Sequence, residues 1–529
     1  MTEVRDRTAA LPALDVPDVG PGLRGRDWTR WVVAAAALAV AVGVVLRFFA
    51  TSDLWLDESL SVNISRLPIA RIPAALRQDG APPAYYVLLH LWMQLFGDGN
   101  VAVRALSGIF SVAALPLAWR AGLRLGGRVA AGATLVLLAT APYSTRYATE
   151  GRMYSLVSLL VLGGFLLVSR CLTRPTPGRL LALSLLTGTL LLTHYWGFYL
   201  LLVVGGWLLW QGFGGTRVAG ATDARNARMV LLALGGGGLL FLPWLPTFLF
   251  QLAHTGTPWG GGAALNAMVD TVSEYAGGNA TGGPFLFLLL VGLIALALFA
   301  RPIDDHRVEL DFRTRPRARP LAIAGFATLA LAVTVGSVTN SAYEVRYTAV
   351  AFPLVILLAG LGATALVDRR VRNLFLAAAA LLGLTTGMSV ATTDRTQAGQ
   401  VGRIISAQAR ADDVVAYCPD QLGPAVSRVV KAPVTQLTYP RWLPPDRIDW
   451  VDYAQVNRSA DAASFALRLV QAAGPHDIWL VWQNGYKTFR GRCAALAKDL
   501  ALLRPGDVPE VIARTSVLEH EYLDRYPSP

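Results

Sequence analysis

A short acidic stretch, residues 51–59, holds the side chains best suited to acid–base chemistry. Asp53, Asp57 and Glu58 lie within six residues of one another, directly after the apolar run 31–50. A carboxylate at the edge of a membrane helix can take a proton from a hydroxyl group. It can equally be part of a solvated helix end, which is the common case for clustered charges. The choice between these interpretations depends on what the rest of the chain places beside Asp57 and Glu58.

The composition indicates a membrane protein. Apolar residues make up 54% of the chain, mean hydropathy is +0.45, and the apolar residues come in blocks. The net charge of +12 resides largely in short arginine-rich loops between these blocks. Such loops are typical of the cytoplasmic side of membrane proteins, so the charge does not indicate a nucleic-acid partner. Residues 1–30 show no removable signal peptide, and we expect the run 31–50 to remain as an anchor.

Charge bias predicts the topology. The run 83–96 has about fourteen residues, a length more typical of an interfacial helix than of a span. When it is excluded, every arginine-rich loop falls on one side, which gives about eleven spans. The expected spans are 31–50, 101–119, 129–142, 154–168, 180–193, 198–210, 229–250, 285–300, 321–338, 347–367 and 374–390.

The predicted fold is therefore a mainly α, polytopic protein of the bacterial plasma membrane. It has a cytoplasmic N-terminal tail (1–30), a transmembrane domain (31–391) and an extracytoplasmic α/β domain (392–529). The first extracytoplasmic loop, 51–97, is expected to carry two short juxtamembrane helices between residues 63 and 96.

The C-terminal region alternates strand and helix patterns. Residues 413–417 and 478–482 resemble buried strands, and residues 460–473 and 493–503 resemble helices. Cys418 and Cys493 both fall in this region. A disulfide between them and two buried, unpaired thiols both fit the sequence.

Further polar residues share the predicted outer face with Asp57. Several adjoining spans have only about fourteen or fifteen residues, which is short for a bilayer core of roughly 30 Å. Their outer ends are therefore expected to enclose a polar cavity, where ionisable residues are candidates for function. The candidates are Tyr85, Arg146, Glu150, Arg152, Tyr154, His194, Arg346 and Tyr347.

Each of these candidates also has a purely structural interpretation. Arg146 and Glu150 are four residues apart and can pair along one helix face. His194 stands among aromatic residues that are typical of a membrane interface. Arg346 can be an anchor that extends its charge toward the interface.

Six short motifs, taken in order, resemble those of bacterial GT-C glycosyltransferases, specifically the family of protein O-mannosyltransferases and lipid A aminoarabinose transferases. The resemblance runs from about residue 31 to residue 366 and excludes the C-terminal region. One departure is Ala81, where relatives often carry His or Lys. The motifs are Trp55-Leu56-Asp57-Glu58, Ala81-Pro82-Pro83-Ala84-Tyr85-Tyr86, Leu95-Phe96-Gly97-Asp98, Glu150-Gly151-Arg152-Met153-Tyr154, Thr193-His194-Tyr195-Trp196-Gly197 and Arg346-Tyr347.

The resemblance implies transfer of a sugar, with inversion, from a polyprenyl phosphate to an acceptor hydroxyl on the extracytoplasmic side. It implies that Asp57 is the general base and that Glu58 orients the acceptor or a neighbouring loop. Arg346 and Arg152 are then expected to bind the lipid phosphate. Support for that phosphate is expected from Tyr154 and His194, and the remaining cavity residues are Tyr85, Arg146, Glu150 and Tyr347.

Several features stay open at the level of sequence. The sugar can be of mannose or arabinose type, and the acceptor can be an envelope glycan, lipid or protein. A divalent cation, Mg²⁺ or Ca²⁺, would need more oxygen ligands than Asp57 and Glu58 supply. The alternative functions are a transporter or flippase of lipid-linked sugars and a scaffold that displays the C-terminal domain. The polar groups lie at one face, whereas transporters place them near the midplane between inverted repeats.

Overall fold

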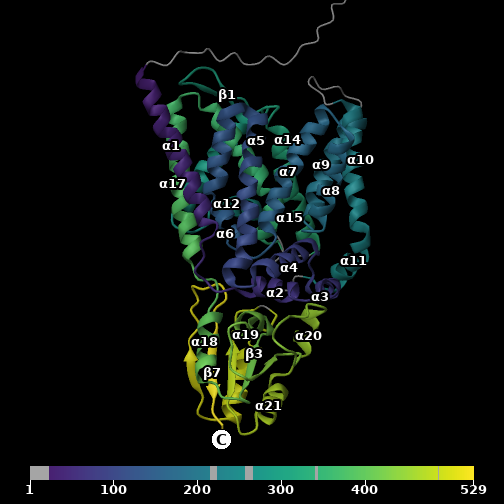
Figure 1. Cartoon of the computed structure of the whole chain (residues 1–529), viewed down its shortest axis with the longest axis vertical. Coiled ribbons are helices and arrows are strands. Elements are labelled where there is room, and N and C mark those ends of the chain that lie inside the picture. Colours follow the sequence, from purple (N-terminus) through teal and green to yellow (C-terminus); the bar gives the residue numbers. More distant parts are fainter. Residues whose placement is uncertain (1–22, 215–222, 257–265, 340–342, 487, 529) are drawn as a thin grey trace, which may run out of the picture.

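The structure, a computed structural model, describes residues 23–214, 223–256, 266–339, 343–486 and 488–528, with side chains from residue 30 onward. A bundle of long helices stands at one end of the molecule and a small sheet domain at the other (Figure 1). Several short helices lie across the end of the bundle that faces the sheet domain, and we call this end the domain end.

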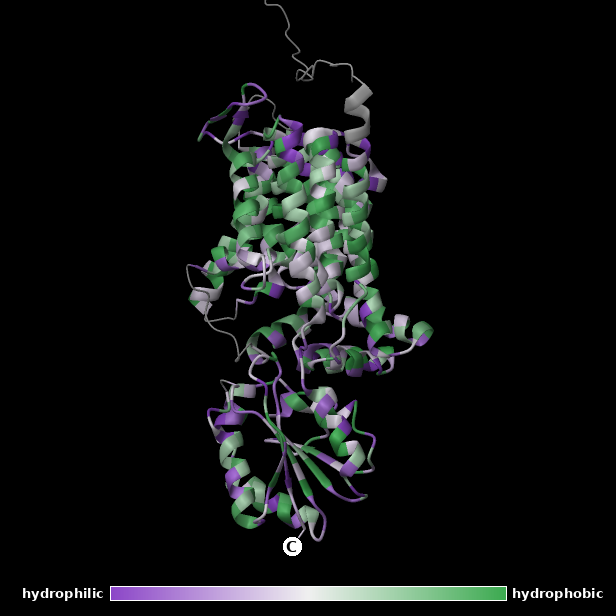
Figure 2. Cartoon of the chain, turned by 90° about the vertical axis from the view of Figure 1, so that its left-hand side faces the viewer, coloured by the Kyte–Doolittle hydropathy of each residue, from purple (hydrophilic) through white to green (hydrophobic). Residues whose placement is uncertain are grey.

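The bundle is that of a multi-pass membrane protein. Within the described ranges, five helical segments are long and apolar enough to cross a membrane. Apolar residues form a broad band along the bundle (Figure 2). The multi-pass prediction is confirmed, and the number of about eleven spans stays a prediction. The long helices are α1 (Leu23–Leu46), α5 (Asn100–Thr140), α7 (Tyr154–Thr173), α8 (Pro177–Leu191), α9 (Gly197–Phe213), α10 (Ala224–Phe241), α13 (Gly283–Phe299), α15 (Thr328–Thr339), α16 (Phe352–Gly362) and α17 (Arg369–Thr392).

Helix α5 consists of two limbs that pack against each other. Gly126 and Gly127 have non-helical dihedral angles, and the φ of Gly127 is +71°, in the left-handed region that favours glycine. A Cβ atom on Gly122 would lie 2.6 Å from the Cα of Ala131, so the limbs meet closely beside this break. The two limbs correspond to the separate predicted runs 101–119 and 129–142.

Short elements complete the bundle. The segments α11 (Leu245–His254) and α14 (Arg319–Ala322) continue longer helices, and β1 (Ala300–Pro302) pairs with β2 (Val308–Leu310) as an antiparallel hairpin. The elements α6 (Pro142–Ala148), α12 (Ala267–Tyr275) and the 3₁₀ helix η4 (Val345–Val350) each contribute residues to a cavity that residues of the sheet domain also line.

The loop after α1 is more helical than the sequence predicted. It forms α2 (Leu56–Ser65), α3 (Ile72–Asp79) and α4 (Ala84–Phe96), with the 3₁₀ turn η1 (Ile69–Arg71) between the first two. The prediction of two short helices between residues 63 and 96 missed α2. Nine of the ten residues of α2 are buried. Because α2 is covered on several sides, its sequence lacks the one-sided apolar pattern by which surface helices are recognised.

The C-terminal domain is built on a five-stranded sheet of order β4-β3-β5-β7-β6. The strand β3 pairs in parallel with β4 and β5, whereas β7 is antiparallel to β5 and β6. The predicted strands and helices correspond to β3, β5, α21 and α22. The elements are α18 (Ala398–Gln408), β3 (Val414–Cys418), α19 (Gly423–Ser427), β4 (Thr435–Thr438), α20 (Tyr453–Ser459), α21 (Ala462–Ala473), β5 (Ile478–Trp482), α22 (Arg492–Leu503), β6 (Val508–Val511) and β7 (Tyr522–Tyr526).

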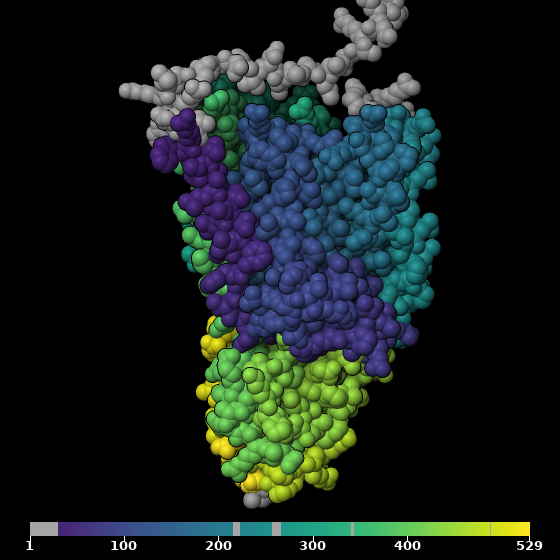
Figure 3. Space-filling model, in the orientation of Figure 1, coloured from purple at the N-terminus to yellow at the C-terminus, as the bar shows by residue number. Residues whose placement is uncertain are grey.

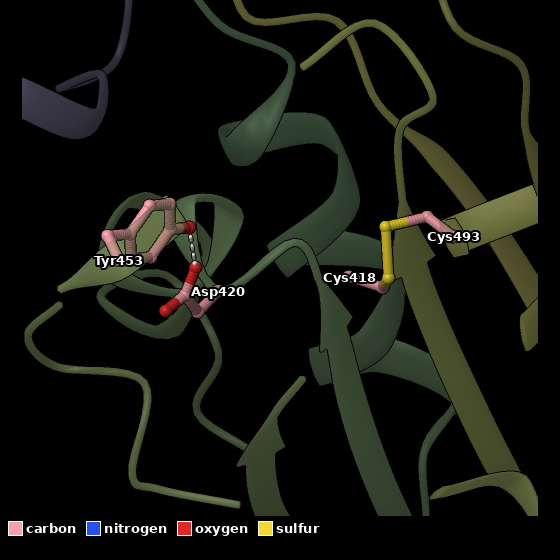
Figure 4. Close-up of a disulfide and its surroundings, with 4 residues drawn as sticks. All are labelled: Cys418, Asp420, Tyr453 and Cys493. Carbon is pink, nitrogen blue, oxygen red and sulfur yellow. Dashed lines mark hydrogen bonds between the residues drawn. A yellow bond between two sulfur atoms is a disulfide. The ribbon is translucent and has the colours of Figure 1, made fainter. Parts of the chain in front are cut away.

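Of the two alternatives for Cys418 and Cys493, the structure has the disulfide (Figure 4). The two Cα atoms are 5.4 Å apart, which is ordinary for a bridged pair. The bridge joins the end of β3 to the first turn of α22. The third cysteine, Cys171 in α7, is buried and unpaired.

A buried acid, Asp420, follows β3 and accepts a hydrogen bond from the hydroxyl of Tyr453 (Figure 4). Burial raises the pKa of Asp420 to about 7 from 3.8, even though the Tyr453 hydrogen bond opposes this rise. The folded state therefore binds a proton more readily than the unfolded chain. The resulting stabilisation is fully present below about pH 4 and is lost as the pH rises through 7.

We therefore expect the melting temperature of the detergent-solubilised protein to fall between pH 5 and pH 8. Asp420→Asn should make this dependence flatter, because a neutral amide replaces the group that loses its proton. The exposed Asp412 provides the control, since Asp412→Asn should keep the wild-type dependence. An Asp420→Asn variant with the wild-type dependence would show that Asp420 is not the titrating group.

Candidate active site

Asp57 lies beside two arginines that are remote in sequence. The Asp57 Oδ2 atom is 3.2 Å from Arg346 Nη1 and 4.0 Å from Arg152 Nη2. All three side chains are largely buried, with exposed fractions of 16% for Asp57, 19% for Arg346 and 12% for Arg152. Asp57 stands in the first turn of α2, where a carboxylate is favoured by the positive end of the helix dipole. Three residues of the predicted site thus meet at one point.

The two arginines are held in different ways. Arg152 Nη1 donates to the hydroxyl of Tyr86 at 3.1 Å and to Ser61 Oγ at 3.0 Å. The Arg346 guanidinium lies 5.9 Å from the ring centre of Trp55, within the range of a cation–π contact. Among the described residues, the ion pairs of both arginines are with Asp57. Two cations face one carboxylate, so the cluster can accept a further anion.

Aromatic side chains form a wall next to Arg346. The ring of His194 lies 5.9 Å from the ring of Tyr154 and 5.4 Å from that of Tyr347. The Tyr347 ring is 5.5 Å from the Arg346 guanidinium. The backbone N–H of Trp196 donates to His194 Nδ1 at 3.2 Å. His194 and Tyr154, which were predicted to support the phosphate, therefore lie on the same side of the site as Arg346.

Glu58 forms a buried ion pair with Arg104 and holds the loop that contains Gly151. Its carboxylate accepts from Arg104 Nε at 2.8 Å and Nη2 at 2.7 Å, and from the backbone N–H of Gly151 at 2.9 Å. Exposure is 0% for Glu58 and 6% for Arg104. Of the two roles expected for Glu58, the geometry favours orientation of the loop that carries Arg152. Sequence reasoning missed Arg104, although an arginine within the predicted span 101–119 is itself a signal.

The other predicted residues lie around this centre. Arg146 and Glu150 form an ion pair of 3.0 Å, although Glu150 lies beyond the end of α6 and not on its face. The hydroxyl of Tyr85 is 3.2 Å from Ser107 Oγ, which in turn donates to the backbone carbonyl of Arg152. Tyr85 therefore contacts the backbone of Arg152 indirectly, through the Ser107 hydroxyl.

A cavity of about 560 Å³ opens between the domain end of the bundle and the sheet domain. Tyr143, Arg146 and Tyr147 line it from the bundle, and residues 515–518 and His520 line it from the sheet domain. Val345 also lines it, one residue before Arg346. The cavity thus lies next to the Asp57 cluster and has the size of pockets that enclose small ligands.

In the part of the chain that the structure describes, no group of three or more His, Cys, Asp or Glu side chains could hold a metal ion.

Comparisons with known proteins agree with the motifs. The family model described as dolichyl-phosphate-mannose-protein mannosyltransferase matches residues 80–245. No curated protein sequence matches the chain. The structure is similar to ArnT from Cupriavidus metallidurans in the apo state, with 17% identity, a TM-score of 0.61, and coverage of 95% of this chain and 100% of that one.

Two further solved structures extend the likeness. ArnT bound to undecaprenyl phosphate gives a TM-score of 0.58 at 17% identity, with 95% of this chain and 99% of that chain covered. The apo oligosaccharyltransferase of Archaeoglobus fulgidus gives 0.51 at 11% identity, with 89% and 72% covered. The chain therefore shares the fold of these solved structures, as the resemblance of its ordered motifs implied.

Proposed function

We propose that this membrane protein is an inverting glycosyltransferase that moves a sugar from a polyprenyl phosphate to a hydroxyl of a cell-envelope acceptor. The observation that carries the proposal is the Asp57 carboxylate with Arg346 and Arg152 within 4.0 Å. Inverting transfer needs one group that takes a proton and others that bind the leaving phosphate. ArnT, which shares the fold, has been solved with undecaprenyl phosphate and so supports a lipid-linked donor.

In the proposed reaction, Asp57 takes the proton of the acceptor hydroxyl while its oxygen bonds to the anomeric carbon. The bond from that carbon to the phosphate oxygen breaks, and the phosphate leaves with the electron pair. Arg346 and Arg152 bind this anion through charge-assisted hydrogen bonds, which are stronger than neutral ones. His194 and Tyr154 support the phosphate from the aromatic wall.

The two substrates are proposed to arrive by different routes. The donor is embedded in the bilayer and passes along α4, whose outward face is apolar and includes Leu88, Leu91 and Leu95. The acceptor, an envelope glycan, lipid or protein, enters through the cavity between the bundle and the sheet domain. This arrangement explains why the chain needs no fold for a nucleotide-linked sugar.

The sheet domain is proposed to face the extracytoplasmic side, with the N-terminus in the cytoplasm. The support is the position of Arg120, Arg124 and Arg128, which flank the break of α5. A Cβ atom on Gly126 at this break would lie 3.1 Å from the Thr364 side chain, shortly before α17 begins, and α17 runs from there toward the sheet domain (Figure 1). Short loops rich in arginine are retained on the cytoplasmic side.

The test is a transfer assay with the purified full-length chain. Radiolabelled polyprenyl-phosphate mannose and polyprenyl-phosphate arabinose are each incubated with an envelope extract, and the label on the acceptor is measured. Transfer with inversion at the anomeric carbon is the expected result. Lipid translocation without transfer would replace the proposal by the flippase alternative.

Arg346→Gln is expected to weaken the binding of undecaprenyl phosphate by roughly 10-fold or more, because hydrogen bonds to charged groups contribute about 1.5–3 kcal/mol. Arg77→Gln is the matched control. Arg77 lies in α3 over the ring of Phe250, and this variant should bind within about twofold of wild type. Binding can be measured by thermal shift or native mass spectrometry. Equal affinity for wild type and Arg346→Gln would remove Arg346 from the phosphate site.

A further inference from the structure

The loop that joins β6 to β7 reaches from the sheet domain to the start of α2. Glu519 in this loop is buried, and its Oε1 atom accepts a 3.2 Å hydrogen bond from the backbone N–H of Leu56. Leu56 is the first residue of α2, and Asp57 is the second. A side chain 463 positions away along the chain therefore contacts the helix that carries Asp57. The space-filling view shows the sheet domain packed tightly against this part of the chain (Figure 3).

The first turn of α2 needs a partner of this kind. The first N–H groups of a helix have no acceptor within the helix. A Ser, Thr, Asp or Asn side chain just before the helix usually supplies one. In α2 this position is occupied by Trp55, which makes no side-chain capping hydrogen bond. Glu519 thus supplies, from another domain, a hydrogen-bond acceptor that the local sequence lacks.

Glu519 is itself fixed by residues 393–397, the linker between α17 and α18. Its backbone N–H donates to the carbonyl of Arg395 at 2.9 Å, and its carbonyl accepts from the N–H of Gln397 at 3.0 Å. The Gln397 side-chain oxygen also accepts from the N–H of Arg514 at 2.7 Å, at the other side of the β6–β7 loop. The linker therefore holds the loop in the orientation that brings Glu519 to Leu56.

The same linker holds the segment that leads into α2. The backbone N–H of Arg395 donates to Ser52 Oγ at 2.9 Å. The buried Arg395 guanidinium donates to the carbonyl of Thr149 at 2.6 Å, in the loop that precedes Arg152. The segment from Ser52 to Leu56 is therefore held at one end by Arg395 and at the other by Glu519. Both residues come after the last bundle helix in the sequence.

We propose that Glu519 is a positioning residue: by capping α2 from the sheet domain, it fixes the direction in which the Asp57 carboxylate meets the two arginines. The expected effect of Glu519 on activity rests on the proposed function. The expected effect of Glu519 on the start of α2 does not, because it depends only on the hydrogen bond to Leu56.

The protonation state of Glu519 decides which substitution is conservative. Burial raises the pKa of Glu519 to about 8, although hydrogen bonds from Thr396 and Leu56 oppose this rise. The raised pKa favours the neutral carboxylic acid, which accepts a hydrogen bond through its carbonyl oxygen. Glutamine has the same shape and also offers a carbonyl oxygen. Glu519→Gln therefore preserves the cap and Glu519→Ala removes it.

The kinetic test compares these variants at pH 7 in the transfer assay. Glu519→Ala should lower kcat at least 10-fold and leave the KM for the lipid donor within twofold, whereas Glu519→Gln should stay within threefold of wild type. Asn63→Ala is the matched control, because Asn63 lies in the same helix and its side chain donates to Asp446 of the sheet domain at 2.6 Å. It removes a domain contact without affecting the helix start, so kcat should stay within threefold of wild type.

Hydrogen exchange gives a readout that needs no sugar transfer. Amides of residues 56–59 should exchange at least 10-fold faster in Glu519→Ala than in wild type, and at the wild-type rate in Glu519→Gln. If the wild-type protein shows no transfer activity, the proposed function is refuted. The exchange measurement then still tests whether Glu519 caps α2. Unchanged exchange in Glu519→Ala, or equal effects of Glu519→Ala and Asn63→Ala on kcat, would overturn the proposal.

Discussion

Asp57→Asn is expected to lower the rate of sugar transfer by roughly 10²–10⁴-fold, the usual contribution of a general base. The amide keeps the size of the side chain and cannot take the proton of the acceptor hydroxyl. The measurement is kcat for transfer from a polyprenyl-phosphate sugar at saturating acceptor extract. Asp53→Asn is the matched control, because it makes the same change in the same stretch. Asp53 lies 3.2 Å from Arg403 of the sheet domain, and its loss should leave kcat near the wild-type value.

Binding of the lipid carrier should not be weakened by Asp57→Asn. Asp57 and a donor phosphate compete for Arg346 and Arg152, so removal of the Asp57 charge should leave the affinity for undecaprenyl phosphate unchanged or higher. A variant that binds the carrier normally and fails to transfer would place the defect in the chemical step. Wild-type transfer by Asp57→Asn would show that another group takes the proton.

Much of the bundle could be predicted because a membrane-spanning helix is determined by the residues within and next to it in the sequence. A helix that crosses a bilayer needs a long apolar run, and the arginines between runs indicate their direction. The two limbs of α5 could be separated because a stretch that carries Arg120, Arg124 and Arg128 interrupts the apolar pattern between them. Helix α2 could not be identified in this way. It is buried between the bundle and the sheet domain, and its two carboxylates, Asp57 and Glu58, pair with arginines that are remote in sequence.

The candidate site shows the same division. The sequence indicated Asp57, Arg152 and Arg346 as a set, because all three fall on the predicted outer face and within the ordered motifs. Nothing local indicates that Arg346 reaches Asp57 or that Glu519 reaches Leu56. These contacts depend on how the helices pack and on how the sheet domain docks. In the sheet, β3 and β5 are central and apolar, whereas β4 and β6 are edge strands with exposed residues and weaker patterns.

The buried pair of Glu58 and Arg104 leads to the largest expected effect on stability. Arg104→Ala leaves the Glu58 carboxylate buried at 0% exposure without its cation. Removal of one partner of a buried ion pair typically costs about 3–5 kcal/mol, because the remaining charge is desolvated and unpaired. The pair also holds Gly151, so the loop that carries Arg152 should become mobile as the fold weakens. The measurement is the melting temperature of the protein in lipid nanodiscs.

Arg403→Ala is the matched control for this experiment. It removes the cation of the Arg403–Asp53 pair, whose side chains are 67% and 31% exposed, and exposed pairs contribute about 0–1 kcal/mol. Arg104→Ala should therefore lower the melting temperature far more than Arg403→Ala. A double variant, Arg104→Met with Glu58→Gln, should recover part of the loss, because no unpaired charge remains in the site. Equal, small shifts for Arg104→Ala and Arg403→Ala would mean that water reaches Glu58 once Arg104 is gone. The orientation of the Arg152 loop would then depend on the Tyr86 and Ser61 contacts of Arg152 itself.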